Sequence, residues 1–148
     1  MTVLDEGNEL ARSPKTYDVV QKKRRFHNHV TAVPLGSKIR FLNQDKFFHH
    51  IYCPESSGLN VPEHRGAVVR KPKKLGKYEL FCDIHPLMNA YIFVVPNDHF
   101  TSPKEGQYSL KNVPSGEYLL RVWHPRLPGK SYKVKVSANE LLKQDIRL

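Results

Sequence analysis

Cysteine is scarce in this sequence, and long apolar runs are absent. The 148 residues include two cysteines, too few for a disulfide-dense scaffold or for a zinc module built from several cysteines. No run approaches the roughly 18 consecutive apolar residues of a membrane-spanning helix, so we expect no membrane span. Nor does any long segment show the apolar spacing of an amphipathic helix, which argues against a mainly helical fold.

Acidic residues are also few. The chain has 14 Asp and Glu against 24 Lys and Arg, a formal net charge of +10. The cations gather in two basic clusters, Lys22–Arg25 and Arg70–Lys74. Such a surface suits simple solvation, nucleic acid, an anionic membrane or an acidic protein. Neither an aromatic stacking platform nor a recognition helix accompanies the clusters, so we expect no nucleic-acid partner.

The beginning of the chain, residues 1–14, is polar and acidic and lacks the apolar segment of a signal peptide. We expect this part to be a flexible N-terminal segment. A cytoplasmic protein and an exported protein whose leader has been removed both remain open at this point.

The rest of the chain is typical of short strands. Residues 38–43 and 131–136 alternate between apolar and polar side chains, as in half-buried strands. Residues 90–95 are continuously apolar and end at a proline, which indicates a buried central strand. Gly, Pro and Ser between 54 and 66 predict an irregular loop. We expect an all-β sandwich or barrel, with strands at 16–21, 29–33, 38–43, 47–52, 77–82, 90–95, 106–110, 118–123, 131–136 and 145–148.

One loop carries the residues with distinctive chemistry. Cys82, His85 and Met88 follow one another at intervals of three, between two predicted strands. A thiolate, an imidazole and a thioether can converge in such a loop, and together they favour copper. A blue-copper site needs a second imidazole, and His49 on an earlier strand is the natural candidate. The alternative is a free cysteine, a surface histidine and a core methionine without a metal.

These segments resemble the cupredoxins, most closely their plastocyanin and amicyanin-like branch. The resemblance covers roughly residues 16–97. It implies a Greek-key β-sandwich of residues 15–97, a type 1 copper ion and one-electron transfer in the bacterial periplasm, with no enzyme activity. Carried over position by position, the copper ligands are His49, Cys82, His85 and Met88. The matching motifs are Gly36-x-x-Ile39-x-Phe41-x-Asn43-x-Asp45, Phe48-His49-His50-Ile51-Tyr52 and Phe81-Cys82-Asp83-Ile84-His85-Pro86-Leu87-Met88-x-Ala90-Tyr91.

A second resemblance lies further along the chain. The pattern from Gly106 to His124 is similar to the carboxypeptidase regulatory-like, transthyretin-like β-sandwich repeat. Residues 98–148 are too short for a complete domain of that kind. We therefore expect a short additional β-meander at the C-terminus, packed on the cupredoxin-like domain.

The sequence departs from the amicyanin-like pattern at two positions. His50 stands where that branch usually has an asparagine, and alternation places His49 and His50 on opposite faces of a strand. The motif alignment favours His49 as the ligand. Cys53 is an additional cysteine, and a Cys53–Cys82 disulfide would destroy the site. Four residues of strand span about 13 Å, so a Cys82 close to His49 argues against that disulfide.

Three further histidines have less definite interpretations. His27 and His29 share a strand face and form either part of a second metal site or a polar surface. His124 follows the tryptophan of the second motif, and we assign it no role.

We expect a one-electron carrier whose basic clusters steer an acidic redox partner. Four other functions remain open: a copper-handling protein without electron transfer, a β-sandwich binding module without metal, an enzyme with a Cys–His nucleophile pair, and a zinc site that adds Cys53 to His49, Cys82 and His85.

Overall fold

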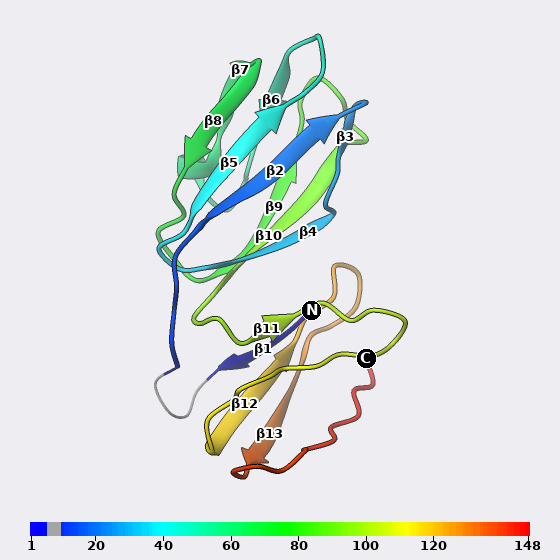
Figure 1. The fold of residues 1–148 in the computed structure, drawn as a ribbon. Coiled ribbons are helices and arrows are strands. Elements are labelled where there is room, and N and C mark those ends of the chain that lie inside the picture. Colours follow the sequence, from blue (N-terminus) through cyan, green and yellow to red (C-terminus); the bar gives the residue numbers. More distant parts are fainter. Residues whose placement is uncertain (6–9) are drawn as a thin grey trace. The chain divides into compact units, whose positions relative to one another are not determined.

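The computed structural model describes residues 1–5 and 10–148, and the chain divides into two compact units. The larger unit is Ser13–Pro96, and the smaller unit joins Met1–Arg12 to Asn97–Leu148. The prediction of an all-β fold is confirmed, because the described residues form strands and one short 3-10 helix, η1 (Ser57–Leu59), but no α-helix (Figure 1). None of the helical structure described has the length and apolar character needed to cross a membrane.

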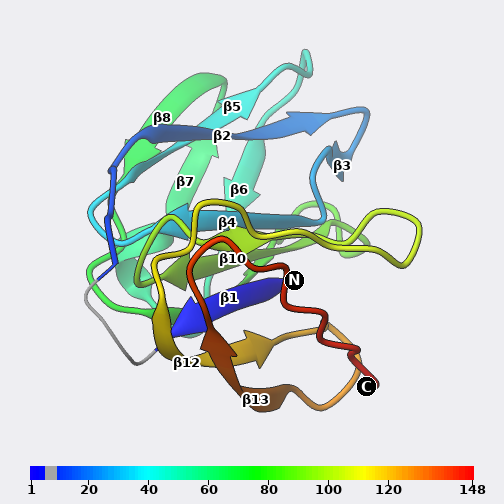
Figure 2. The same cartoon turned by 60° about the horizontal axis from the view of Figure 1, so that its bottom comes forward.

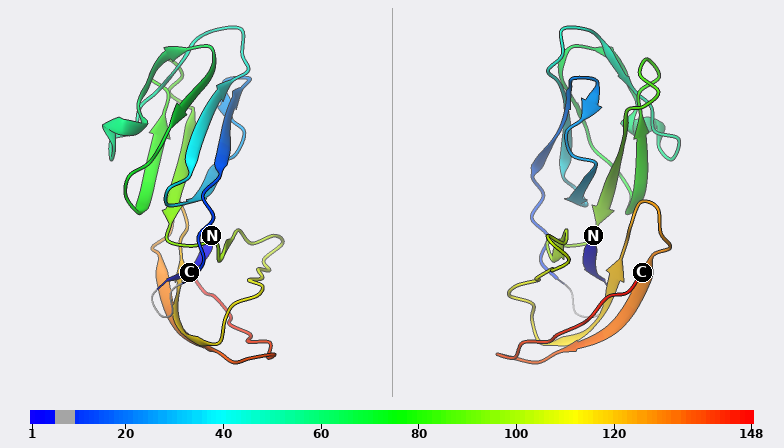
Figure 3. Two further views of the ribbon diagram at one scale, coloured as in Figure 1. Left: turned by 60° about the vertical axis from the view of Figure 1, so that its left-hand side comes forward. Right: turned by 90° about the vertical axis from the view of Figure 1, so that its right-hand side faces the viewer.

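The larger unit is a sandwich of two layers, visible in Figures 2 and 3. One sheet has the order β3-β2-β5-β8, and the other has the order β4-β10-β9. The hairpin β6-β7 continues the second sheet through a bridge between Tyr52 and Phe81. The strands are β2 (Thr16–Lys22), β3 (Arg25–Phe26), β4 (Val30–Pro34), β5 (Lys38–Asn43), β6 (His49–Ile51), β7 (Val61–His64), β8 (Gly66–Arg70), β9 (Gly76–Phe81) and β10 (Asn89–Val95).

The core of the larger unit follows from the alternation seen in the sequence. Ile39 and Phe41 on β5 are fully buried and belong to the same cluster as Leu80 on β9 and Ile92 on β10. Burial of each such side chain contributes about 1.5–3 kcal/mol. The apolar run at 90–95 forms β10, which pairs with β4 on one side and β9 on the other, as expected for a central strand.

The smaller unit is a single four-stranded sheet with the order β11-β1-β12-β13 (Figure 1). Its core contains Leu4, Tyr118, Leu120 and Val134. The strands are β1 (Thr2–Asp5), β11 (Phe100–Thr101), β12 (Gly116–Val122) and β13 (Lys130–Val136).

The prediction of a flexible segment over residues 1–14 is wrong at its beginning. Thr2–Asp5 form β1, which pairs with β11 and β12, and the N-terminal ammonium of Met1 donates a hydrogen bond to the Trp123 carbonyl at 2.8 Å. Val3 and Leu4 are buried, with 3% exposure each. The short apolar stretch therefore belongs to a core, although the acidic residues that follow it make the segment look polar in the sequence. Residues 6–9 of the predicted segment lie outside the described residues.

Three other element boundaries differ from expectation. Val61–His64 form β7 inside the region predicted as an irregular loop. Pro62 is tolerated there because β6 is the one strand that pairs with β7 among the described residues, which leaves the other edge of β7 unpaired. Residues 106–110 contribute one isolated bridge, Lys104 with Gln107, and no strand. Residues 145–148 are not a strand either; the Arg147 backbone instead bonds the Tyr132 hydroxyl.

Candidate metal centre

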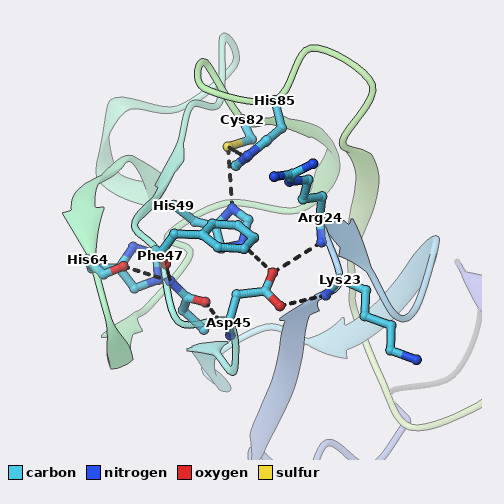
Figure 4. Close-up of polar contacts among 9 residues, drawn as sticks. Lys23, Arg24, Asp45, Phe47, His49, His64, Cys82 and His85 are labelled. Atoms are coloured by element: carbon cyan, nitrogen blue, oxygen red, sulfur yellow. Dashed lines mark hydrogen bonds and ion pairs between the residues drawn. The ribbon is translucent and has the colours of Figure 1, made fainter.

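Three potential ligand side chains converge at one end of the larger unit. The ligand atoms of His49, Cys82 and His85 all lie within 4.8 Å of one another. The Nδ1 atoms of the two imidazoles each lie 3.7 Å from the Cys82 sulfur (Figure 4). At bond lengths typical of zinc, about 2.3 Å for sulfur and about 2.0 Å for nitrogen, donors in a trigonal arrangement are about 3.7 Å apart. The spacing of these donors therefore suits a single ion.

His49 is fully buried on β6, and a carboxylate fixes its ring. Its Nε2 lies 2.8 Å from Oδ2 of Asp45. A carboxylate only accepts hydrogen bonds, so Nε2 carries the hydrogen and the Nδ1 lone pair points at the sulfur. This is the tautomer that a metal ligand needs, and a carboxylate behind a ligating imidazole also strengthens it as a donor.

Asp45 is itself held by the turn between β2 and β3. Its carboxylate accepts the backbone N–H groups of Lys23 at 2.7 Å and Arg24 at 3.1 Å. Burial acts to raise the pKa of Asp45, but the hydrogen bonds from His49, Arg24 and Lys23 outweigh burial and hold this pKa below its usual value. A half-buried carboxylate with three N–H donors stays ionised and keeps one position.

The loop that leads to His49 is tied down by Asn43. The Asn43 side-chain amide donates to the carbonyls of Phe47 at 2.9 Å and His64 at 2.8 Å. Its Oδ1 accepts the backbone N–H of Asp45 at 2.9 Å. The motif Asn-x-Asp-x-x-x-His thus uses the asparagine to shape the loop and the aspartate to orient the histidine.

His85 comes from the loop after β9 and is half-buried. The His85 N–H donates to the Cys82 carbonyl at 3.2 Å, and the Met88 N–H donates to the His85 carbonyl at 2.9 Å. These two turns fold the Cys-x-x-His-x-x-Met segment back on itself. The Phe47 ring packs against His85 and His49, with centroid distances of 5.4 and 5.2 Å. Burial, with a smaller contribution from the Arg24 charge, lowers the pKa of His85, which favours the neutral imidazole that binds metals.

Met88, the fourth predicted ligand, is 2% exposed and belongs to the core of the larger unit. It lies at the end of the same folded loop as Cys82 and His85. Its role as an axial ligand stays a prediction.

His50 and Cys53 lie outside the three-residue group. Nδ1 of His50 is 2.9 Å from the Asp83 carboxylate. Cys53 is a free thiol, as is Cys82, so the two form no disulfide. The Cys53 sulfur instead contacts Glu55 at 3.5 Å, and burial raises its pKa to about 11. Its exclusion from the group also argues against a zinc site of two cysteines and two histidines.

The remaining histidines of interest have structural contacts. His27 and His29 are exposed, and within the described residues they belong to no metal-binding group of three or more. His29 packs edge-on against the Tyr91 ring at 5.3 Å. The His124 Nδ1 accepts the Arg126 N–H at 3.1 Å and so braces its own loop.

Sequence reasoning missed the role of the turn at Lys23 and Arg24. Its contacts with Asp45 join segments more than twenty residues apart, and no local sequence pattern predicts such a contact. The basic cluster was the only signal at this place.

No protein-family model matches the sequence, and no curated protein matches it. Solved structures do match, and the neighbours include cupredoxins. A copper-containing nitrite reductase from Thermus scotoductus is 26% identical over 58% of this chain and 23% of its own, with a TM-score of 0.48. A purple cupredoxin from Nitrosopumilus maritimus is 17% identical over 53% of this chain and 98% of its own (TM-score 0.46).

Amicyanin from Paracoccus versutus is 19% identical over 53% of this chain and 79% of its own, with a TM-score of 0.43. The chain thus spans less than a quarter of the nitrite reductase and most of the two smaller proteins. At these scores the case for a function is made by the side chains of the site and not by the likeness.

Proposed function

We propose that this chain is a type 1 copper protein that carries single electrons, with His49, Cys82, His85 and Met88 as its ligands. The observation that supports this most directly is the convergence of one thiol and two imidazoles, each imidazole nitrogen being 3.7 Å from the sulfur. One thiolate, two imidazoles and a thioether form a soft donor set that suits copper better than zinc, magnesium or calcium.

Copper bound here would supply reversible one-electron chemistry, and the chain's own residues would hold the ligands still while the electron moves. His49 is fixed by Asp45, and the loop leading to it is fixed by Asn43. Cys82 and Met88 are buried in a packed core. Ligands held this firmly change position little between two oxidation states, which keeps electron transfer fast.

His85 provides the route to the surface. It is the one half-buried member of the group, and it lies between exposed neighbours in its loop. Ile84 is 44% exposed and Leu87 is 98% exposed. An apolar surface of this small size suits brief encounters with a redox partner. We take that partner to be acidic because the chain is strongly basic, and we take the compartment to be the bacterial periplasm, as the resemblance to cupredoxins implies.

The test is to add Cu(II) to the purified protein and to record the visible spectrum. An intense thiolate-to-copper band is expected in the wild type and in Cys53→Ser, which is the matched control. The band should be absent in Cys82→Ser. A colourless wild-type complex would contradict the proposal.

Voltammetry of the copper-loaded protein separates a carrier from a copper-handling protein. A carrier should show a reversible one-electron wave. Irreversible reduction, or tight binding of Cu(I) with loss of Cu(II), would indicate copper handling instead.

A further inference from the structure

The two basic clusters of this chain lie at opposite ends of the larger unit. Gln21, next to the Lys22–Arg25 cluster, pairs with Asn43 at the end of β5. Arg70, which opens the other cluster, pairs with Ile39 near the start of β5. Four residues of strand separate these two positions by about 13 Å. Only the Lys22–Arg25 cluster is therefore at the end that holds His49, Cys82 and His85.

The turn of this cluster has a fixed backbone. Lys23 and Arg24 have φ values of 53° and 56°, in the left-handed region that residues other than glycine rarely adopt. The Asp45 carboxylate accepts both of their N–H groups, which stabilises this conformation. The same carboxylate holds His49. The turn is thus held beside the candidate metal centre by a shared anion, and its two cationic residues are exposed there.

Arg24 reaches the ring that covers both imidazoles. Its guanidinium carbon lies 5.3 Å from the centroid of the Phe47 ring, which packs against His85 and His49 (Figure 4). Near the same end, the Arg65 guanidinium lies 4.5 Å from the ring of the exposed Phe48. Arg24 therefore lies beside the ring that contacts the half-buried imidazole, and this exposed residue can offer its donor groups to an incoming anion.

The carboxylates nearest the ligands are already engaged. Asp45 accepts hydrogen bonds from the turn and from His49, and Asp83 is 2.9 Å from His50. Within the described residues, no ion pair uses the Arg24 side chain. An exposed guanidinium without an internal anion suits a bidentate contact with a carboxylate from another molecule.

We propose that the Lys23–Arg24 turn is a docking element for an acidic protein, and that Arg24 binds a carboxylate of that partner beside His85. The proposal rests on the function proposed above, since it places the partner at the imidazole through which the electron would leave. The Arg70–Lys74 cluster, at the far end, has no part in this contact. The turn would orient the partner, while the apolar loop of Ile84 and Leu87 provides the remaining contact.

A binding test that needs no copper examines the docking element alone. Hexaglutamate is titrated into the isotope-labelled full-length protein, and amide resonances are followed by NMR. We expect shifts at Lys23, Arg24 and the His85 loop. Arg24→Glu should remove these shifts, whereas Lys73→Glu, which makes the same change in net charge at the far end, should preserve them. Equal losses in the two variants, or shifts confined to residues 71–74, would overturn the proposal.

An electron-transfer test with charged reagents then examines the copper-loaded protein. Oxidation of the reduced protein by anionic hexacyanoferrate(III) should be slower in Arg24→Glu by on the order of tenfold at low salt. Lys73→Glu should change the rate by less than about twofold. Reduction by cationic hexaammineruthenium(II) should become faster in Arg24→Glu.

Two further observations keep the outcomes separate. Arg24→Lys retains the charge and should keep most of the rate, whereas a loss as large as that of Arg24→Glu would indicate damage to the turn and would contradict a role for charge. If no copper band forms but hexaglutamate binds at the turn, the proposed function fails and the docking element stands. If the copper band forms and the rates of Arg24→Glu and Lys73→Glu agree, the docking element fails and the proposed function stands.

Discussion

The two cysteines of this chain occupy similar positions with very different neighbours. Cys53 follows Tyr52 and Cys82 follows Phe81, and these two aromatic residues are bridged to each other. Both thiols are 2% exposed. Cys82 has two imidazole nitrogens at 3.7 Å, whereas Cys53 has the Glu55 carboxylate at 3.5 Å. The two thiols therefore share the same burial and differ in the polar atoms around the sulfur, and only the surroundings of Cys82 suit a metal ion.

The largest expected effect is on copper affinity, when an imidazole beside Cys82 is removed. His49→Ala should lower the affinity for Cu(II) by at least roughly a hundredfold, since loss of a ligand exceeds the 10–100-fold loss typical of a residue behind a ligand. His50→Ala is the control, because His50 contacts Asp83 and not the sulfur. Competition with a chelator of known affinity measures both. Equal losses of affinity in the two variants would mean that copper binding needs an intact β6 and not the His49 imidazole.

The next effect concerns the carboxylate behind His49. Asp45→Asn should lower copper affinity by about 10–100-fold and raise the reduction potential, because a negative charge near the ion is lost. Arg40→Gln and Asp18→Asn, which break a surface ion pair in the same unit, serve as controls. An unchanged potential would show that Asp45 shapes the loop only.

Asp45 also predicts a dependence of stability on pH. Its pKa in the folded protein lies below the unfolded value of about 3.9. Its contribution to stability is therefore complete above that value and is lost as the pH falls through the lower, folded pKa. Urea unfolding of the metal-free protein between neutral pH and pH about 3 should show this loss. Asp45→Asn should reduce the slope of stability against pH in the acid range.

On the other side of the comparison, Cys53→Ser should affect stability and leave copper binding unchanged. A hydroxyl in this buried position costs about 1–3 kcal/mol if it lacks a full partner. Thermal unfolding and a copper titration of the same variant measure the two properties. Loss of the copper band in Cys53→Ser would contradict the expectation that copper binding depends on Cys82 and not on Cys53.

The smallest effect is expected at Glu55. Burial is the largest cause of the raised pKa of Cys53, about 11, and the Glu55 charge is a lesser one. Glu55→Gln should therefore lower the pKa only slightly. The alkylation rate of Cys53 should still rise about tenfold per pH unit between pH 8 and 10, because the thiolate fraction does so below the pKa. Mass spectrometry measures the alkylation rate. A rate that stops rising between pH 8 and 10 in Glu55→Gln would show that the Glu55 charge raises the pKa of Cys53 more than burial does.

Local patterns in the sequence predicted the strands of the larger unit and the tight loop of residues 82–88 well. Alternation at 38–43 and the apolar run at 90–95 report burial directly, and Cys82, His85 and Met88 lie within seven residues of one another, so one loop brings them together. His49 required the motif as well, because its approach to Cys82 depends on the bridge between Tyr52 and Phe81, two residues almost thirty positions apart.

Other features had no local signal. Thr2–Asp5 become a strand only because β12 offers an edge more than a hundred residues later. The Asp45 contacts with the β2–β3 turn likewise arise from the tertiary fold. Residues 106–110 alternate as a strand would, but Lys104 and Gln107 form only one bridge there, and side-chain packing in the smaller unit uses Tyr108 and Leu110 without a ladder.

The place of β1 in the smaller sheet has a consequence for biosynthesis. Leu4 pairs with Leu120, so β1 has no partner in β12 until residues 116–122 have been synthesised. The larger unit is one continuous stretch and can finish folding in the meantime. A C-terminal fragment beginning after the larger unit would lack an inner strand of its sheet, so a truncated version of the smaller unit should be prepared with residues 1–12 fused to it.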